Sequence, residues 1–290
     1  MSTTPPANRL LTCGTIGISD GAIGFFRFRN PSAIGEIAIA LWTRKAADMN
    51  VANQKILIVG GGSGMGFALA RRCLDAGARV VIAGRSGARL DGARAALGHS
   101  DRLEAAKVDI ASEEQVVALF EQVGQLDHIV CTAADIGGAY QLLPQLERAA
   151  VQQVMDSKFY GPLWLAKHGA PMLSGAGSIT FTSGIAAYRP AARGSVVAAV
   201  NAALEGLVRA LAVELAPVRV NAVSPGWVDT EIWSSIAGDS KDETLAAMAK
   251  RLPVGRVGRP DDIADALGFL IGNGFTTGTV LHVEGGHRLI

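Results

Sequence analysis

Short apolar runs alternate with longer helical patterns along the chain from Lys55 onward. Apolar runs of about four to eight residues, bounded by glycine or polar residues, are typical of strands buried on both faces. The clearest runs are KILIVG, ARVVIAG, DHIVCTA, SITFTS, VRVNAVS and GTVLHVE, with a weaker one at RLEAAKVD. Strands that alternate with helices indicate a parallel sheet. The pattern predicts an α/β fold: a single-domain, Rossmann-type, doubly wound parallel sheet of about seven strands with helices on both faces.

Helical periodicity fills the segments between these runs. The predicted helices span residues 66–76, 112–123, 147–173, 196–216, 241–251 and 260–271. Ser112, with Gln115 three residues later, resembles a capping box and sets the start of the second helix.

Residues 1–52 differ from the rest of the chain because glycine, aromatic and charged residues mix there without a sustained period. Arg27, Arg29 and Glu36 interrupt the apolar runs, which argues against a signal peptide and a membrane span. We expect a poorly ordered extension, or a true start at Met49, followed by one folded domain over residues 53–290. The alternative is a membrane-surface anchor through residues 37–42.

Charge and cysteine content narrow the function classes. The 290 residues carry 27 basic and 26 acidic side chains, scattered without a basic stripe, so nucleic acid and membrane partners are not expected. Cys13, Cys73 and Cys131 are odd in number and lack metal-ligand spacing. The cysteines predict reduced thiols in a cytoplasmic protein and no metal site. With nucleic acid and membranes not expected, the predicted partner is a small-molecule substrate.

A glycine-rich turn joins the first predicted strand to the first helix. Glycines allow a tight turn and close backbone approach to a pyrophosphate, whose charge lies at the helix N-terminus. A turn that merely connects two elements is the alternative. The residues predicted to contact the cofactor here are Gly60, Ser63, Gly64, Met65 and Gly66.

Arg85 and Ser86 end the second strand, where an acidic residue would hold the ribose 2′-hydroxyl of NAD. Arginine can grip a 2′-phosphate instead, and Ser86 can add a hydrogen bond, so NADP(H) is favoured. The alternative is a solvated Arg85, with Arg89 or Arg94 supplying the charge. Asp109, after the third strand, is placed to cap the adenine amino group or to cap a turn.

Together these motifs resemble those of the short-chain dehydrogenase/reductase family over about residues 55–286. The glycine loop matches with Val59 in place of the family's threonine, and Asp109-Ile110 matches the adenine-contacting pair. The segment 221–230 matches the part that holds the nicotinamide carboxamide through the backbone of Val228 and the hydroxyl of Thr230. The resemblance also implies cofactor contacts from Ala133, Pro225 and Gly226.

The active-site motifs depart from the family. Cys131-Thr132-Ala133-Ala134 replaces Asn-Asn-Ala-Gly, and Lys158 stands at the catalytic asparagine. Ser183 keeps the place of the substrate-orienting serine. Val197 falls on the catalytic tyrosine and Asn201 on the lysine; shifting the register by one residue gives Val196 and Val200. Both registers lose the pair that protonates the alkoxide as hydride reaches a carbonyl.

Loss of a general acid lowers a rate by roughly 10² to 10⁴, so a substitute is needed for ordinary ketone reduction. Lys158 is a candidate proton donor if it is desolvated; the alternative is a surface lysine whose aliphatic stem packs on the protein. Tyr188 is a second candidate; the alternative is a loop tyrosine packed beside Pro190. Asp135 could pair with a substrate cation or Lys158, or cap a turn. Cys131 lies too deep to be a nucleophile.

The predicted function is an NADP(H)-dependent oxidoreductase with a non-standard active site, acting on an imine, iminium or activated carbonyl. Ser183, Lys158 and Tyr188 are its candidate catalytic residues. The alternatives are a catalytically silent NADP(H)-binding sensor or scaffold, and a lyase or cyclase. The lid expected over residues 227–251 carries Trp233, which suits a ring-bearing substrate or lid packing equally.

The segment 196–216 predicts assembly. Its polar residues Asn201, Glu205 and Arg209 form one narrow stripe, and the apolar remainder exceeds what the sheet can cover. The helix around Trp164 and Leu165 is similarly apolar, and members of the resembling family pair these two helices. A homodimer or homotetramer is expected, with burial under the protomer's own loops as the alternative.

Overall fold

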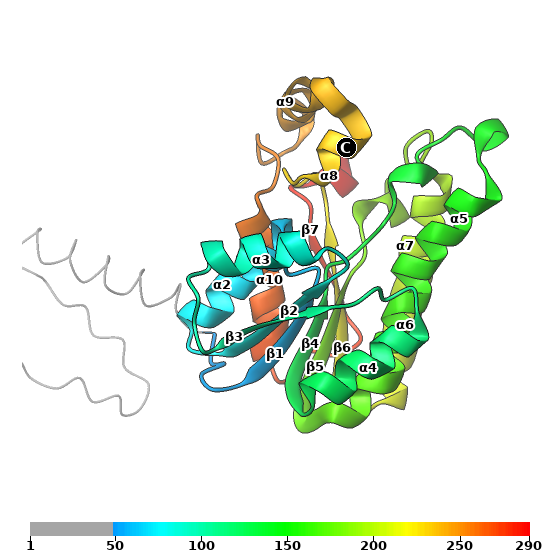
Figure 1. Cartoon of the computed structure of the whole chain (residues 1–290). Helices are drawn as coiled ribbons and strands as arrows, with labels where there is room; N and C mark the ends of the chain where they lie inside the picture. Colours follow the sequence, from blue (N-terminus) through cyan, green and yellow to red (C-terminus); the bar gives the residue numbers. More distant parts are fainter. Residues whose placement is uncertain (1–48) are drawn as a thin grey trace, which may run out of the picture. The chain divides into compact units, whose positions relative to one another are not determined.

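Seven strands form one sheet in the order β3-β2-β1-β4-β5-β6-β7 in the computed structural model, which describes residues 49–290 (Figure 1). All six neighbouring pairs are parallel. The strands are β1 (Lys55–Val59), β2 (Arg79–Gly84), β3 (Leu103–Lys107), β4 (Leu126–Cys131), β5 (Leu173–Thr182), β6 (Arg219–Pro225) and β7 (Val280–Val283). All the predicted strands are confirmed. The order reverses between β1 and β4, where doubly wound sheets open a binding crevice.

Helices cover both faces of this sheet (Figure 1). On one face lie α2 (Gly64–Asp75), α3 (Gly87–Ala96) and α10 (Pro260–Gly272); on the other lie α4 (Glu113–Val123), α5 (Arg148–Met155), α6 (Gly161–Gly169) and α7 (Ser195–Glu214). Alternate side chains of β1 enter different cores: Ile56 and Ile58 pack on the first face, Leu57 and Val59 on the second. Burial on both faces explains why the strands read as unbroken apolar runs.

Two short helices escaped prediction, α3 and α8 (Ile232–Ala237), whereas α9 (Lys241–Arg251) has the predicted bounds. In α3 only Leu90 and Ala93 are buried, and two of its ten residues are glycine, so the helical pattern is weak. The predicted helix 147–173 is wrong at its end, because β5 already begins at Leu173. It is also interrupted by a π turn over Asp156–Tyr160.

The start of α4 forms only one of the two hydrogen bonds of the predicted capping box. Ser112 Oγ accepts a hydrogen bond from the Gln115 amide at 3.2 Å, but the Gln115 side chain accepts from the amide of Asp109 instead of Ser112. We expect Ser112→Ala to lower the free energy of unfolding by about 1 kcal/mol, measured by urea denaturation. Ser63 is the matched control: it precedes α2 but makes no capping bond, so Ser63→Ala should leave stability nearly unchanged.

Two of the three residues of the predicted polar stripe of α7 face inward, which was not expected from the sequence. Asn201 and Glu205 are buried, whereas Arg209 is exposed. The exposed small or apolar residues of the helix include Ala199, Ala202, Ala203, Ala210 and Val213. By length and composition α7 could also cross a membrane, but its buried face packs on the sheet as in a core helix. The predicted homo-oligomer stays a prediction.

The predictions for the N-terminal segment, namely the extension to residue 52, the start at Met49 and the anchor at 37–42, fall largely outside residues 49–290. Cys13 lies outside them as well. Residues from 49 onward belong to one compact unit. The proposed boundary near residue 53 therefore stays a prediction.

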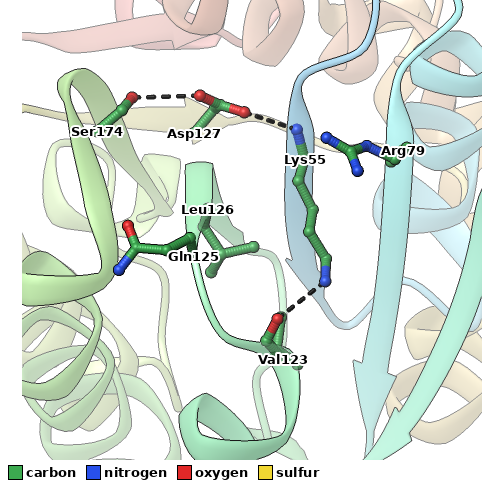
Figure 2. Close-up of a pocket in the computed structure, with 7 residues that line it drawn as sticks. All are labelled: Lys55, Arg79, Val123, Gln125, Leu126, Asp127 and Ser174. Carbon is green, nitrogen blue, oxygen red and sulfur yellow. Dashed lines mark hydrogen bonds between the residues drawn. The ribbon is translucent and has the colours of Figure 1, made fainter.

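A small cavity of about 340 Å³ lies at the amino ends of β1, β2, β4 and β5 (Figure 2). The backbone N–H of Lys55 and the hydroxyl of Ser174 both donate to the Asp127 carboxylate, at 2.8 and 3.2 Å. Lys55 Nζ turns away and donates to the Val123 carbonyl at 2.8 Å. These groups satisfy one another, and parallel sheets bind ligands at the opposite, carboxyl edge. We therefore interpret the cavity as part of the packing at the amino ends of the strands and not as a ligand site.

Candidate functional site

A large cleft of about 1610 Å³ opens at the carboxyl ends of the strands. The loops after β1, β2, β3, β4, β5 and β6 line it, and α8 and α9 stand beyond those strand ends (Figure 1). Every residue predicted to contact the cofactor lines this cleft except Gly66. The lining residues are Gly60, Ser63, Gly64, Met65, Arg85, Ser86, Asp109, Ile110, Ala133, Pro225, Gly226, Val228 and Thr230.

The glycine loop has the geometry that a pyrophosphate needs. Gly60 and Gly64 have φ of 88° and 53°, where side chains are strained. A Cβ on Gly60 would lie 2.6 Å from Thr132 Oγ1, and one on Gly66 would clash with the Gly60 carbonyl. Gly66 thus allows the loop to pack closely without lining the cleft. Because no side chain caps α2, its first amide groups remain available to an anion. These residues fit a dinucleotide cofactor.

Arg85 lines the cleft as predicted, but its guanidinium already has a partner. Nη1 lies 2.8 Å from the Asp135 carboxylate, which comes from the loop after β4. Asp135 therefore pairs with neither Lys158 nor a turn amide. Ser86 Oγ accepts from the Arg89 amide and keeps its own hydrogen for donation. Asp109 caps a turn by accepting from the Ala111 amide at 3.1 Å.

The segment after β6 comes close to the glycine loop. A Cβ on Gly64 would lie 3.5 Å from Thr230 Cγ2, so the two cofactor motifs share one wall. The Val228 carbonyl accepts a hydrogen bond from Trp233 Nε1 at 2.8 Å. Trp233 also stacks on Trp227, with ring centres 4.3 Å apart. These contacts give Trp233 a packing role at the cleft wall.

Lys158 lies under the cleft with only 6% of its surface exposed. Its Nζ donates to the Ser183 carbonyl at 2.9 Å and to Asn201 Oδ1 at 2.7 Å. It belongs to the π turn between α5 and α6, and such turns frequently mark functional sites because they redirect a side chain. Burial lowers the pKa of Lys158 to about 8, opposed by the charge of Glu205. Lys158 is therefore a desolvated amine and no surface lysine.

Lys158 and Asn201 contact each other directly, with Nζ and Oδ1 2.7 Å apart. The alignment predicted from sequence places Lys158 at the family's asparagine and Asn201 at its lysine, so by that alignment the two residue types have exchanged positions. The register stays a prediction. Val197 is buried in an apolar cluster with Ala139 and Val154, so it offers no proton.

Ser183 lies beside Lys158 at the cleft, but Tyr188 does not reach it. Ser183 Oγ donates to Glu205 Oε1 at 2.7 Å, and the Tyr188 hydroxyl donates to Glu205 Oε2 at 2.5 Å. The hydrogen bond to Glu205 raises the pKa of Tyr188, which makes it a weaker acid. Tyr188 is 43% exposed and is not among the lining residues. The structure thus brings Ser183 and Lys158 together at the cleft, whereas Tyr188 is connected to Ser183 only through Glu205.

Two polar residues near the site were not proposed from sequence. Glu205 was interpreted only as part of the polar stripe, although its spacing of four from Asn201 put both on one helix face. His287 lines the cleft with 8% of its surface exposed, and its Nδ1 is buried without a hydrogen-bond partner among residues 49–290. Burial and the charges of Arg189 and Arg251 lower the pKa of His287, opposed by the charge of Glu284. No local motif pointed to it.

The described cysteines have no reactive surroundings. Burial raises the pKa of Cys131 to about 11 and that of Cys73 to about 12, so both are thiols near neutral pH. Within residues 49–290 no three His, Cys, Asp or Glu side chains are grouped as metal ligands. Lys158 and Ser183 stay the candidate catalytic residues of the cleft.

Comparisons with known proteins agree with this geometry. A family model described as enoyl-(acyl carrier protein) reductase matches residues 59–288. The short-chain dehydrogenase/reductase ucsE of Acremonium sp is 37% identical over 249 residues, which cover 80% of this chain and 94% of that protein.

Solved structures also resemble this chain over most of its length. MalC Reductase/Diels-Alderase from Malbranchea aurantiaca superposes with a TM-score of 0.77 at 33% identity, over 84% of this chain and all of that one. A small-chain dehydrogenase in complex with NADPH superposes with a TM-score of 0.67 at 34% identity, over 82% of this chain and all of that one.

Proposed function

Because this chain belongs to the short-chain dehydrogenase/reductase family, we propose that it is an NADP(H)-dependent oxidoreductase acting on a protonated imine or an activated carbonyl. The coarser part, an oxidoreductase of this family acting on a small molecule, follows from the relatives. The finer part rests on one observation: the buried Lys158 with its partner Asn201 stands where the family has its proton-donating apparatus. When bound, the cofactor would supply or accept hydride.

Lys158 and Ser183 determine which acceptors this site suits. An enone or dicarbonyl develops negative charge on oxygen, and a protonated Lys158 can stabilise that charge or donate a proton to it. A protonated imine takes hydride at a cationic carbon and needs no proton in the same step. Both acceptors avoid the tyrosine that is absent from position 197, whereas an ordinary ketone does not.

The test is NADPH oxidation with a cyclic imine, an enone, a dicarbonyl and a plain cyclic ketone, with products identified in each case. We expect turnover of at least one of the first three and slow or absent turnover of the ketone. No turnover across the panel together with tight NADPH binding would support the silent binding protein instead.

A cyclase is the second candidate. The specific observation in its favour is the likeness to a protein titled Reductase/Diels-Alderase, which joins hydride and ring-forming chemistry in one short-chain reductase fold. A cyclase would use the cleft to hold a reactive substrate in one conformation. Ring formation that proceeds without NADPH oxidation would identify it.

Arg85 is proposed to select NADP(H) over NAD(H). We expect Arg85→Ala to weaken NADPH binding by about tenfold or more, the effect of one charge-assisted hydrogen bond, and to change NADH binding by less than about threefold. Calorimetric titration of both cofactors measures this difference. Arg94→Ala, on the following helix α3 but outside the cleft lining, is the control. An equal loss for both cofactors would contradict the proposal.

A further inference from the structure

The hydrogen-bond partners of Ser183 are unusually one-sided. Its Oγ lies 2.7 Å from Glu205 Oε1 and 3.4 Å from the Asn201 carbonyl oxygen, and both of these atoms are acceptors. A hydroxyl has a single hydrogen, and the shorter contact takes it. Within residues 49–290 no group donates to Ser183 Oγ. The lone pairs of the oxygen are therefore left for a ligand.

Glu205 is held so that it accepts. Its two carboxylate oxygens each receive a hydroxyl hydrogen bond, one from Ser183 and one from Tyr188. Only 4% of its surface is exposed, and no basic side chain of the described part of the chain forms an ion pair with it. Donated hydrogen bonds stabilise a carboxylate, so the buried charge keeps both hydroxyls turned toward it.

The surrounding backbone fixes the same arrangement. Lys158 Nζ holds the Ser183 carbonyl at 2.9 Å, and a Cβ on Gly184 would lie 2.8 Å from Asn201 Nδ2. The chain at Ser183 thus lies tightly against α7, within reach of Glu205. Turning the hydroxyl hydrogen into the cleft would leave Oε1 of a buried carboxylate without its donor, which is costly.

We propose that Glu205 is a positioning residue that makes Ser183 a hydrogen-bond acceptor toward the cleft. The site then selects a substrate group that donates, the N–H of a protonated imine or amine, over a carbonyl oxygen, which can only accept. This inference rests on the proposed function for the reaction and names the substrate class among the acceptors considered there. A substrate oxygen would meet the lone pairs of Ser183 and be repelled.

The test compares two five-membered rings of similar size, pyrrolidine, which carries N–H donors, and cyclopentanone, which accepts. Their affinities are measured by calorimetry with and without NADP⁺. We expect the wild type to prefer pyrrolidine, and Glu205→Gln to reduce the ratio of affinities by about tenfold or more. The glutamine amide can donate to Ser183 Oγ and release the serine hydrogen to the cleft. Glu214→Gln, exposed near the end of the same helix, is the control.

Two further measurements keep the test decisive if Glu205→Gln folds poorly. Ser183→Ala should weaken pyrrolidine binding and leave cyclopentanone binding within about twofold. The ultraviolet titration of Tyr188, obtained as wild type minus Tyr188→Phe, should have a midpoint above that of a free tyrosine, because Glu205 raises the pKa of Tyr188.

An unchanged ratio in Glu205→Gln, a larger loss of ketone than of amine in Ser183→Ala, or an ordinary Tyr188 titration would each overturn the inference. Failure of NADP⁺ to bind would instead contradict the proposed function. The ligand ratio measured without cofactor and the Tyr188 titration would still report on Glu205. The two failures are therefore distinguishable.

Discussion

Replacing Lys158 by methionine is expected to lower kcat for an enone or dicarbonyl by about 10²-fold or more. Methionine fills a similar volume but offers no hydrogen to a developing oxyanion, and it leaves the Ser183 carbonyl and Asn201 Oδ1 without their donor. For a protonated imine the loss should stay below about tenfold, because no oxyanion forms. Steady-state assays with saturating NADPH measure both values.

The pKa of Lys158 predicts the direction in which carbonyl turnover changes with pH. Burial lowers the pKa of Lys158 to about 8, and the protonated form is the one that stabilises negative charge. Carbonyl turnover should therefore be present below about pH 8 and fall as the pH rises through it, and this break should disappear in Lys158→Met. Lys167→Met, which removes an exposed lysine of α6, is the control. Equal kcat for Lys158→Met and wild type with a carbonyl acceptor would remove Lys158 from the mechanism.

The second large effect concerns the exchange of lysine and asparagine. Asn201→Lys alone, which restores the family's residue, should lower the free energy of unfolding by about 3–5 kcal/mol, because it places a second ammonium group beside Lys158 Nζ in a buried position. The double variant Lys158→Asn with Asn201→Lys re-forms the same hydrogen bond with its partners reversed and should recover most of that loss. Urea denaturation of the wild type, both single variants and the double variant completes the cycle.

Ala203→Lys is the matched control, since it adds a lysine to the exposed face of the same helix and should cost little. If the double variant were no more stable than Asn201→Lys, the two positions would not be coupled. The exchange would then be a coincidence of alignment and not a preserved contact.

The sheet and the cofactor cleft could be predicted because their signals are local. Each buried strand is an unbroken apolar run, and the glycine loop and the segment 221–230 carry their geometry in neighbouring residues. The close approach of Gly66 to the Gly60 carbonyl likewise lies within one turn of the chain. The loss of the tyrosine stays a prediction, which does not depend on the register because both registers place valine there.

The partners of the polar side chains could not be predicted, since they come from distant parts of the chain. Arg85 meets Asp135, and Tyr188 meets Glu205, and neither pair shares a motif. The spacing of Asn201 and Glu205 put them on one face of α7 but gave no sign that this face points inward. Lys158 was an open choice between surface and site until the π turn directed its side chain under the cleft.

The stacked pair of Trp227 and Trp233 gives this protein an optical property of its own. Two indole rings with centres 4.3 Å apart and planes inclined by 22° couple their electronic transitions, which yields a paired signal in circular dichroism. Trp233 is also tied to the Val228 carbonyl, so a ligand that moves this wall of the cleft alters the coupling. The protein therefore carries an unlabelled spectroscopic reporter beside its active site.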